Sequence, residues 1–264
     1  MFMKEISSNG NTQTIDVVFP MHPIILFFNP SLMKLLMDPM YENQESGHYP
    51  NKWSIHDLGK HFPNATGHPD GQDESMPVEE CGNMLIMTLV YAQKTGDIEY
   101  LKQHLPILTQ WTQFLVNDSL IPASQLSTDD FAGTLQNQTN LALKGIIGIR
   151  AMGEISHLVG DDSEAQRYNA IAADYIEKWQ EYGIARDAQP PHTTLNYGAN
   201  ESHGLLYNLW SDLELGLKLV PQSVYDMQSA FYPTVKNQYG VPLDTRHTWT
   251  KSEHIISVLV ACQC

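Results

Sequence analysis

The chain of 264 residues is 42% hydrophobic and 17% charged, which provides enough apolar material for a full core and too little charge for a disordered chain. Its net charge of −15, without any cluster of lysine and arginine, argues against nucleic acid as a partner because phosphates would be repelled. Its longest apolar runs fall well short of the roughly 20 residues that cross a bilayer, so we expect no membrane insertion.

Apolar residues recur three and four positions apart from about residue 30 onward, a pattern that predicts an all-α fold. We expect helices over residues 31–44, 77–94, 98–116, 138–158, 162–182, 203–219 and 221–237. Pro39 and Pro106 are expected to break or kink two of these helices. Seven antiparallel helices joined by loops suit a layered helical ring.

The two ends of the chain differ from its middle. Residues 1–30, which contain the sequence IDVVF, are expected to form an extended segment that leads into the helices. Residues 31–252 form one helical domain in this interpretation, because no repeat or interdomain linker divides them. Residues 253–264 are interpreted as an atypical tail.

A long loop, residues 45–76, is rich in Gly, Pro, Asn, His and Asp, and loops of this length without regular structure usually have a function. The loop and the start of the next helix concentrate polar side chains that can bind a substrate or transfer protons. They are His56, Asp57, His61, Asn64, His68, Asp70, Asp73, Glu74, Glu79, Glu80 and Asn83. We expect the first seven of them to bind the substrate.

Glu79 and Glu80 are the first pair of candidate catalytic carboxylates. Pro77 favours the first turn of a helix, where free N–H groups stabilise carboxylates. Simple capping of the helix explains the pair equally well. Because adjacent residues lie about 100° apart on a helix, only one of the two is expected to point straight into a cavity while the other flanks it.

Metal and nucleotide sites find little support in the sequence. The spacing of His56, His61 and His68 is loose for a zinc site. The run from Asp70 lacks the regular oxygen ligands of an EF-hand, although the sequence leaves open whether a calcium ion binds there. No Gly-rich phosphate loop and no G-x-S-x-G motif occurs. We therefore expect neither a metal ion nor a cofactor.

A second group of polar residues lies in the loop between the helices expected over residues 98–116 and 138–158 and at the start of the second of them, in the sequence STDDFAGTLQNQTNLALKG. Asp129 and Asp130 precede a helix on which Asn140 and Lys144, four residues apart, share one face. An N-terminal capping signal with a surface Asn/Lys pair is the alternative interpretation. In the functional interpretation, one of these aspartates faces Glu79 or Glu80 across a shared cavity, with Asn140 and Lys144 binding the substrate.

A third group lies in the sequence LDTRHTWTKS near the C-terminus. Arg246, with Lys251, is positioned to clamp a substrate carboxylate, and Asp244 lies beside it. A surface loop of charged residues is equally compatible with the sequence. We include Asp244 and Arg246 among the candidate substrate-binding residues.

Three long strings resemble the secreted fungal glutaminase A family: YPNKWSIHDLGKHFPNATGHPDGQDESMPVEECGNMLIM, LSTDDFAGTLQNQTNLALKGIIGI and YGVPLDTRHTWTKS. The resemblance extends over about residues 4–252. It implies an α/α toroid of the six-hairpin type, incomplete in this chain and preceded in full-length members by a signal peptide and a β-rich domain.

The resemblance also implies extracellular hydrolysis of L-glutamine to L-glutamate and ammonia. Four N-x-[ST] sequons, at Asn64, Asn117, Asn137 and Asn200, would permit glycosylation of a secreted protein. After Lys251 the sequence SEHIISVLVACQC departs from the Ser-Asp-Trp-Glu-like helix start of the family. We interpret the chain as a fragment of such a protein.

The leading hypothesis from the sequence is a glutamine amidohydrolase in which one of Glu79 and Glu80, and one of Asp129 and Asp130, act as acid and base. A glycoside hydrolase is the alternative, because α/α toroids with paired carboxylates commonly carry out that chemistry. A catalytically inactive remnant is the third possibility.

Overall fold

The computed structural model describes residues 1–6, 8–61, 63–129, 132–252 and 254. The described part of the chain is built of eight helices and one two-stranded sheet, which confirms the all-α prediction. The helices are α1 (Ile15–Phe28), α2 (Ser31–Glu45), α3 (Pro77–Thr95), α4 (Ile98–Asp118), α5 (Thr139–Val159), α6 (Asp162–Gly183), α7 (Leu209–Glu214) and α8 (Gln222–Val235). The strands β1 (Ile184–Ala185) and β2 (His192–Thr193) pair antiparallel.

Two helical hairpins, α3–α4 and α5–α6, use the same Gly-Asp connection. Gly96 and Gly160 end the first helix of each hairpin with left-handed φ values of 73° and 91°, a conformation that favours glycine. Asp97 and Asp161 then cap the next helix by accepting hydrogen bonds from backbone N–H groups of its first turn. These local signals turn the chain back on itself.

Helices α3 and α5 form the centre of the molecule and pack closely against each other. Every residue of α3 from Pro77 to Ala92 is buried. Gly82 permits the close approach, because a Cβ atom at this position would lie 2.6 Å from Cγ of Lys144 on α5. The glycine therefore allows the two helices to approach each other closely near their first turns.

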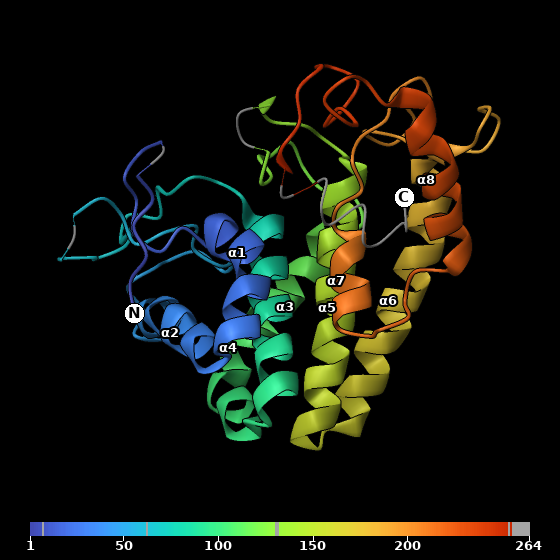
Figure 1. Ribbon diagram of the computed structural model, residues 1–264. Helices are drawn as coiled ribbons and strands as arrows, with labels where there is room; N and C mark the ends of the chain where they lie inside the picture. Colours follow the sequence, from blue (N-terminus) through green and yellow to red (C-terminus); the bar gives the residue numbers. More distant parts are fainter. Residues whose placement is uncertain (7, 62, 130–131, 253, 255–264) are drawn as a thin grey trace.

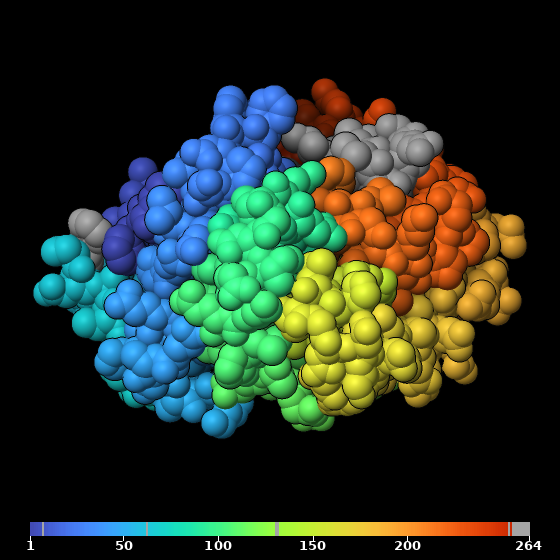
Figure 2. Space-filling view, turned by 90° about the horizontal axis from the view of Figure 1, so that it is seen from below, coloured from blue at the N-terminus to red at the C-terminus, as the bar shows by residue number. Residues whose placement is uncertain are grey.

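The first turns of α3 and α5 lie at the same end of the helical layer, and the long loops gather over that end (Figure 1). Seen from below, the opposite end is a closed surface on which the segments follow one another in chain order, from blue through green to yellow (Figure 2). Within the described residues, no helix is both long and apolar enough to cross a membrane.

The structure corrects three expectations about the elements. Residues 15–28 form helix α1 rather than an extended segment, although Pro20 and Pro23 lie inside it. The helix expected over residues 203–219 shrinks to α7, because backbone hydrogen bonds tie residues 203–205 to the 243–245 segment. Helices α2 and α4 continue through Pro39 and Pro106, so neither proline breaks its helix, and a kink at either one stays a prediction.

Candidate active site

The first turn of α3 directs its two neighbouring carboxylates to different partners. Glu79 and Glu80 are both fully buried. Their side chains leave the helix about 100° apart. Glu79 meets Lys144 of α5, and Glu80 meets the side chains of His56 and Asp16. The turn therefore separates two polar environments, which we call the Lys144 side and the His56 side.

On the Lys144 side, the ammonium Nζ lies 3.3 Å from Oε1 of Glu79 and donates a hydrogen bond of 2.7 Å to Oδ1 of Asn83. It also lies 3.4 Å from the ring centroid of Phe19 in α1, a cation–π contact. Burial lowers the pKa of Lys144, and the negative charge of Glu79 opposes this shift. The ammonium is positioned to offset the buried charge of Glu79.

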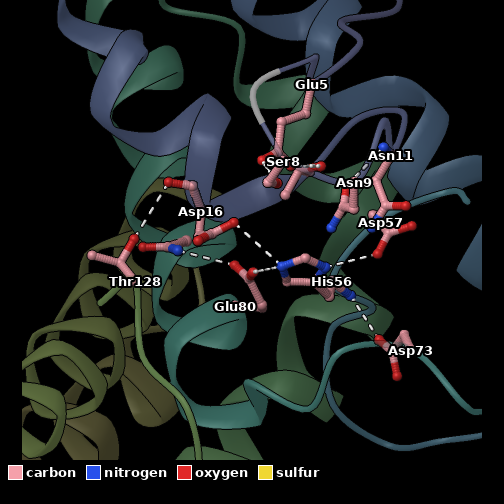
Figure 3. A network of polar contacts seen from close by, with 12 residues as sticks. Glu5, Ser8, Asn9, Asn11, Asp16, His56, Asp57, Asp73, Glu80 and Thr128 are labelled. Atoms are coloured by element: carbon pink, nitrogen blue, oxygen red, sulfur yellow. Dashed lines mark hydrogen bonds and ion pairs between the residues drawn. The ribbon is translucent and has the colours of Figure 1, made fainter. Parts of the chain in front are cut away.

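On the His56 side, Glu80 accepts a hydrogen bond of 3.0 Å from Asn83, and its Oε1 lies 3.9 Å from Nε2 of His56. The same Nε2 lies 3.3 Å from Oδ1 of Asp16 in α1 (Figure 3). Burial, and then the negative charge of Asp16, raise the pKa of Glu80 well above its usual value. Glu80 therefore favours its neutral form.

The loop side of this network is organised by Asp57. Its carboxylate pairs with Nδ1 of His56 at 2.7 Å and with Nε2 of His68 at 2.9 Å, and accepts a hydrogen bond from the backbone of Gly59. Burial would raise the pKa of Asp57, but its hydrogen bonds with His56 and His68 hold it below the usual value. Burial would lower the pKa of His56, and the neighbouring carboxylates of Asp16 and Asp57 raise it instead.

Asp129 approaches the site from the loop between α4 and α5. Its Oδ2 accepts a hydrogen bond of 3.1 Å from the hydroxyl of Tyr207, and its Oδ1 lies 3.3 Å from Nδ1 of His254 and 3.8 Å from Nζ of Lys251. Burial, together with the smaller effect of the Glu79 charge, raises the pKa of Asp129 to about 7 against the opposing effects of Lys251 and Tyr207. Asp130 lies outside the described residues.

A cavity of about 50 Å³, with room for a few water molecules, lies beside the partners of Glu79 and Asp129. Its lining includes Lys144, the partner of Glu79, together with Tyr207 and His254, the partners of Asp129. The rings of Tyr207 and His254 stack at a centroid distance of 3.9 Å. Among the described residues, neighbours of Glu79 and Asp129 line the cavity but the two carboxylates themselves do not, so the expected facing of two carboxylates across a shared cavity stays a prediction.

Two buried carboxylates beside a cavity, one with a pKa near neutrality, suit general acid–base hydrolysis. The first turns of α3 and α5 add N–H groups and helix dipoles that stabilise negative charge at this end. The Lys144 ammonium adds a fixed positive charge at the cavity wall.

Three further candidate substrate-binding residues form hydrogen bonds within the protein near the cavity, namely Asn140, Asp244 and Arg246. Asn140 accepts hydrogen bonds from the backbone N–H and the side chain of Asn208, which joins α5 to the start of α7. Arg246 pairs with Asp244 through Nε and Nη2 and donates to the carbonyl of Ala132. Its guanidinium is thereby engaged with the chain itself, whereas Asn140 and Asp244 line a second cavity of about 10 Å³ with Asp129.

The remaining residues proposed from the loop divide into two groups. His61, Asn64 and Asp70 are exposed, and Asp70 accepts a hydrogen bond from the backbone of Gln72, as in a polar turn. Asp73, in contrast, accepts a hydrogen bond of 2.8 Å from the backbone N–H of His56 and so helps to hold this residue in place. The structure therefore brings His56, Asp57, His68 and Asp73 together in one hydrogen-bonded network. The three exposed residues lie outside this network.

Sequence reasoning did not identify Asp16, Phe19, Tyr207 or His254 as site residues. Asp16 and Phe19 lie in α1, whose prolines and β-branched residues suggested an extended segment. Tyr207 follows no motif, and aromatic residues in helical proteins are usually part of the core. His254 lies in the sequence interpreted as an atypical tail, yet it is 4% exposed and contacts the site.

Comparisons with known proteins agree with this architecture. The sequence model of the glutaminase A six helical-hairpin domain matches residues 1–263. Glutaminase A of Aspergillus oryzae is 66% identical over 253 residues, which cover 96% of this chain and 37% of that protein. A probable glutaminase of Arthroderma benhamiae is 39% identical over 336 aligned positions, which cover 96% of this chain and 39% of that protein.

The chain thus spans 37% to 39% of the length of these curated relatives. The all-α structure with its helical hairpins fits the α/α toroid expected from the sequence. Because the domain model matches nearly all of the chain, the chain belongs to the glutaminase A six-helical-hairpin domain family.

Proposed function

We propose that this domain carries the active site of an amidohydrolase that converts L-glutamine to L-glutamate and ammonia. The proposal is supported by two similar proteins named glutaminase A and probable glutaminase. The observation that carries it is the pair Glu79 and Asp129, whose neighbours Lys144 and Tyr207 line one cavity.

In this mechanism Glu79 is the general base and Asp129 the general acid. Glu79 takes a proton from the attacking water as the oxygen bonds to the carboxamide carbon of glutamine. Asp129, whose pKa of about 7 keeps a proton available near neutrality, protonates the departing nitrogen, which leaves as ammonia. The Lys144 ammonium stabilises the negative charge that develops on the carboxamide oxygen.

Ammonia release from L-glutamine by the protein in its full-length form tests the proposal directly. We expect L-glutamate and ammonia to form in equal amounts. Release of reducing sugar from a panel of glycosides, without ammonia from glutamine, would instead identify the glycoside hydrolase. A folded protein that turns over neither class of substrate would identify the inactive remnant.

We also propose that the protein acts outside the cell. Among its four sequons, Asn64, Asn117 and Asn200 are exposed and Asn137 is half-buried, so at least three asparagines are accessible for glycosylation. Expression of the full-length protein in a fungal host should place it in the medium and give a mobility shift with an endoglycosidase. Retention inside the cells without such a shift would contradict the proposal.

A further inference from the structure

The His56 side brings together three groups that can bind a metal ion. Ligating atoms of Asp16, His56 and Glu80 all lie within 4.8 Å of one another. They come from three separate elements, namely α1, the long loop and α3 (Figure 3). An ion at this position would join elements that are far apart in the sequence.

Two of the oxygens in this cluster have no hydrogen-bond partner among the described residues. They are Oδ1 of Asp16 and Oε1 of Glu80, on side chains that are 10% and 0% exposed. A buried carboxylate oxygen without a donor is costly, and a cation is one of the few partners that satisfies it. Both oxygens face Nε2 of His56, at 3.3 Å and 3.9 Å.

The imidazole is already held as metal-binding histidines are held. Its Nδ1 pairs with Asp57 at 2.7 Å, and Asp57 is itself fixed by His68 and by the backbone of Gly59. A carboxylate that accepts the proton of one ring nitrogen leaves the other with a lone pair for a metal ion. The Nε2 atom faces Asp16 and Glu80, and an ion bound there would take the place of the Nε2 proton in its contact with Asp16.

The distances from Nε2 of His56 to the two carboxylates also suit a small divalent ion. Zinc bonds of about 2.0–2.2 Å to nitrogen and oxygen place two ligands of a tetrahedral ion roughly 3.3–3.5 Å apart. The separation from His56 to Asp16 falls in this range, and that to Glu80 exceeds it by a few tenths of an ångström. One imidazole with two carboxylates is a ligand set of zinc and manganese rather than of calcium.

We propose that Asp16, His56 and Glu80 bind one divalent transition-metal ion, with zinc as the reference ion. The expectation of no metal from the sequence weighed the histidines His56, His61 and His68 and the run from Asp70, and it missed Asp16 because α1 was not recognised. The proposal is independent of the glutaminase assignment, since it concerns binding by residues on the opposite side of the α3 turn from Glu79.

Titration of the EDTA-treated, dialysed full-length protein with Zn²⁺, followed by calorimetry, tests the site. We expect one tight site, and Asp16→Asn, His56→Gln and Glu80→Gln should each weaken the affinity at least tenfold. Asp57→Asn, which only orients His56, should weaken it by about 10-fold to 100-fold. No tight site in the unmodified protein, or unchanged affinity in the three ligand variants, would overturn the proposal.

His104→Gln is the matched control. His104 is buried, its Nδ1 pairs with Glu45 at 2.7 Å, and its Nε2 has no hydrogen-bond partner in the described part of the chain, but it packs on Tyr41 instead of facing two carboxylates. We expect this variant to bind Zn²⁺ like the unmodified protein, whereas an equal loss of affinity would show that the binding depends on buried histidines in general.

A measurement on the unmodified protein covers the case in which a ligand variant fails to fold. Co²⁺ bound by one nitrogen and two carboxylates in a tetrahedral site should give intense visible absorption, which Zn²⁺ should abolish by displacement. Absence of that absorption at saturating Co²⁺ would overturn the proposal without any variant. Neither result depends on whether the protein hydrolyses glutamine.

Discussion

Glu79 and Glu80 are neighbours in the sequence and equally buried, yet they meet different charged partners, and Asn83 links the two sides through its hydrogen bonds with Lys144 and Glu80. Glu79 lies against the Lys144 ammonium beside a cavity that also reaches the partners of Asp129. Glu80 lies against Asp16 and His56, in a network that extends to the loop carboxylates Asp57 and Asp73. One turn of helix therefore divides a candidate catalytic site from a candidate metal site.

The largest expected effect separates these two glutamates. Glu79→Gln should lower the turnover of glutamine by about 10²- to 10⁴-fold, because it removes the proposed general base. Glu80→Gln should cost less, and Asp70→Asn, which alters an exposed carboxylate of the loop, should leave turnover nearly unchanged. Ammonia release measures all three, and a greater loss in Glu80→Gln would reverse the assignment of the two sides.

Lys144→Met should destabilise the protein by about 3–5 kcal/mol, because it leaves Glu79 buried without its counter-charge. Lys102→Met, which breaks the exposed pair of Lys102 with Glu99, should cost much less. Urea unfolding of both variants compares them. Equal costs would mean that the Lys144 side is not held together by its ion pair.

The raised pKa of Asp129 makes stability depend on pH. The folded protein keeps a proton on Asp129 up to about pH 7, whereas the unfolded chain releases it near 3.8. The stability contributed by this group is therefore present below about pH 4 and is lost as pH rises through 7, by at most about 4 kcal/mol. Urea unfolding across this range should show the loss in the unmodified protein relative to Asp129→Asn, and parallel profiles would refute it.

The smallest expected effect concerns the hydroxyl of Tyr207. Tyr207→Phe keeps the ring stacked on His254 but removes the hydrogen bond to Asp129, which should cost about 1–3 kcal/mol of stability. Thermal unfolding measures the cost, with Tyr175→Phe as a control for a half-buried tyrosine that donates to a backbone carbonyl. A loss no larger than the control's would remove Tyr207 from the site.

Much of the helical framework could be predicted because its signals are local. The helix expected over residues 77–94 is observed as Pro77–Thr95, since a proline opens it and Gly96 closes it. Helix α1 could not be predicted in this way. Its two internal prolines disfavour a helix locally, and its packing on α3 and α2 is what stabilises it.

The candidate site could be predicted only in part for the same reason. The density of polar residues around His56 and the first turn at Glu79 and Glu80 are visible in the sequence. Asp16 and His254 could not be identified as site residues, because each joins the site through a contact with a residue at least 40 positions away in the chain. His61, Asn64 and Asp70 looked equivalent to their neighbours but turned outward.

The sequence by itself determined the all-α character, the Gly-Asp turns of two hairpins and the presence of carboxylates in the first turn of α3. Only the tertiary structure decided which carboxylate meets Lys144 and which meets His56. That choice depends on how α3 is rotated against α5, and the absence of a side chain at Gly82 allows the close contact between them. Helical periodicity gives the angle between Glu79 and Glu80, whereas packing alone gives the direction in which each one points.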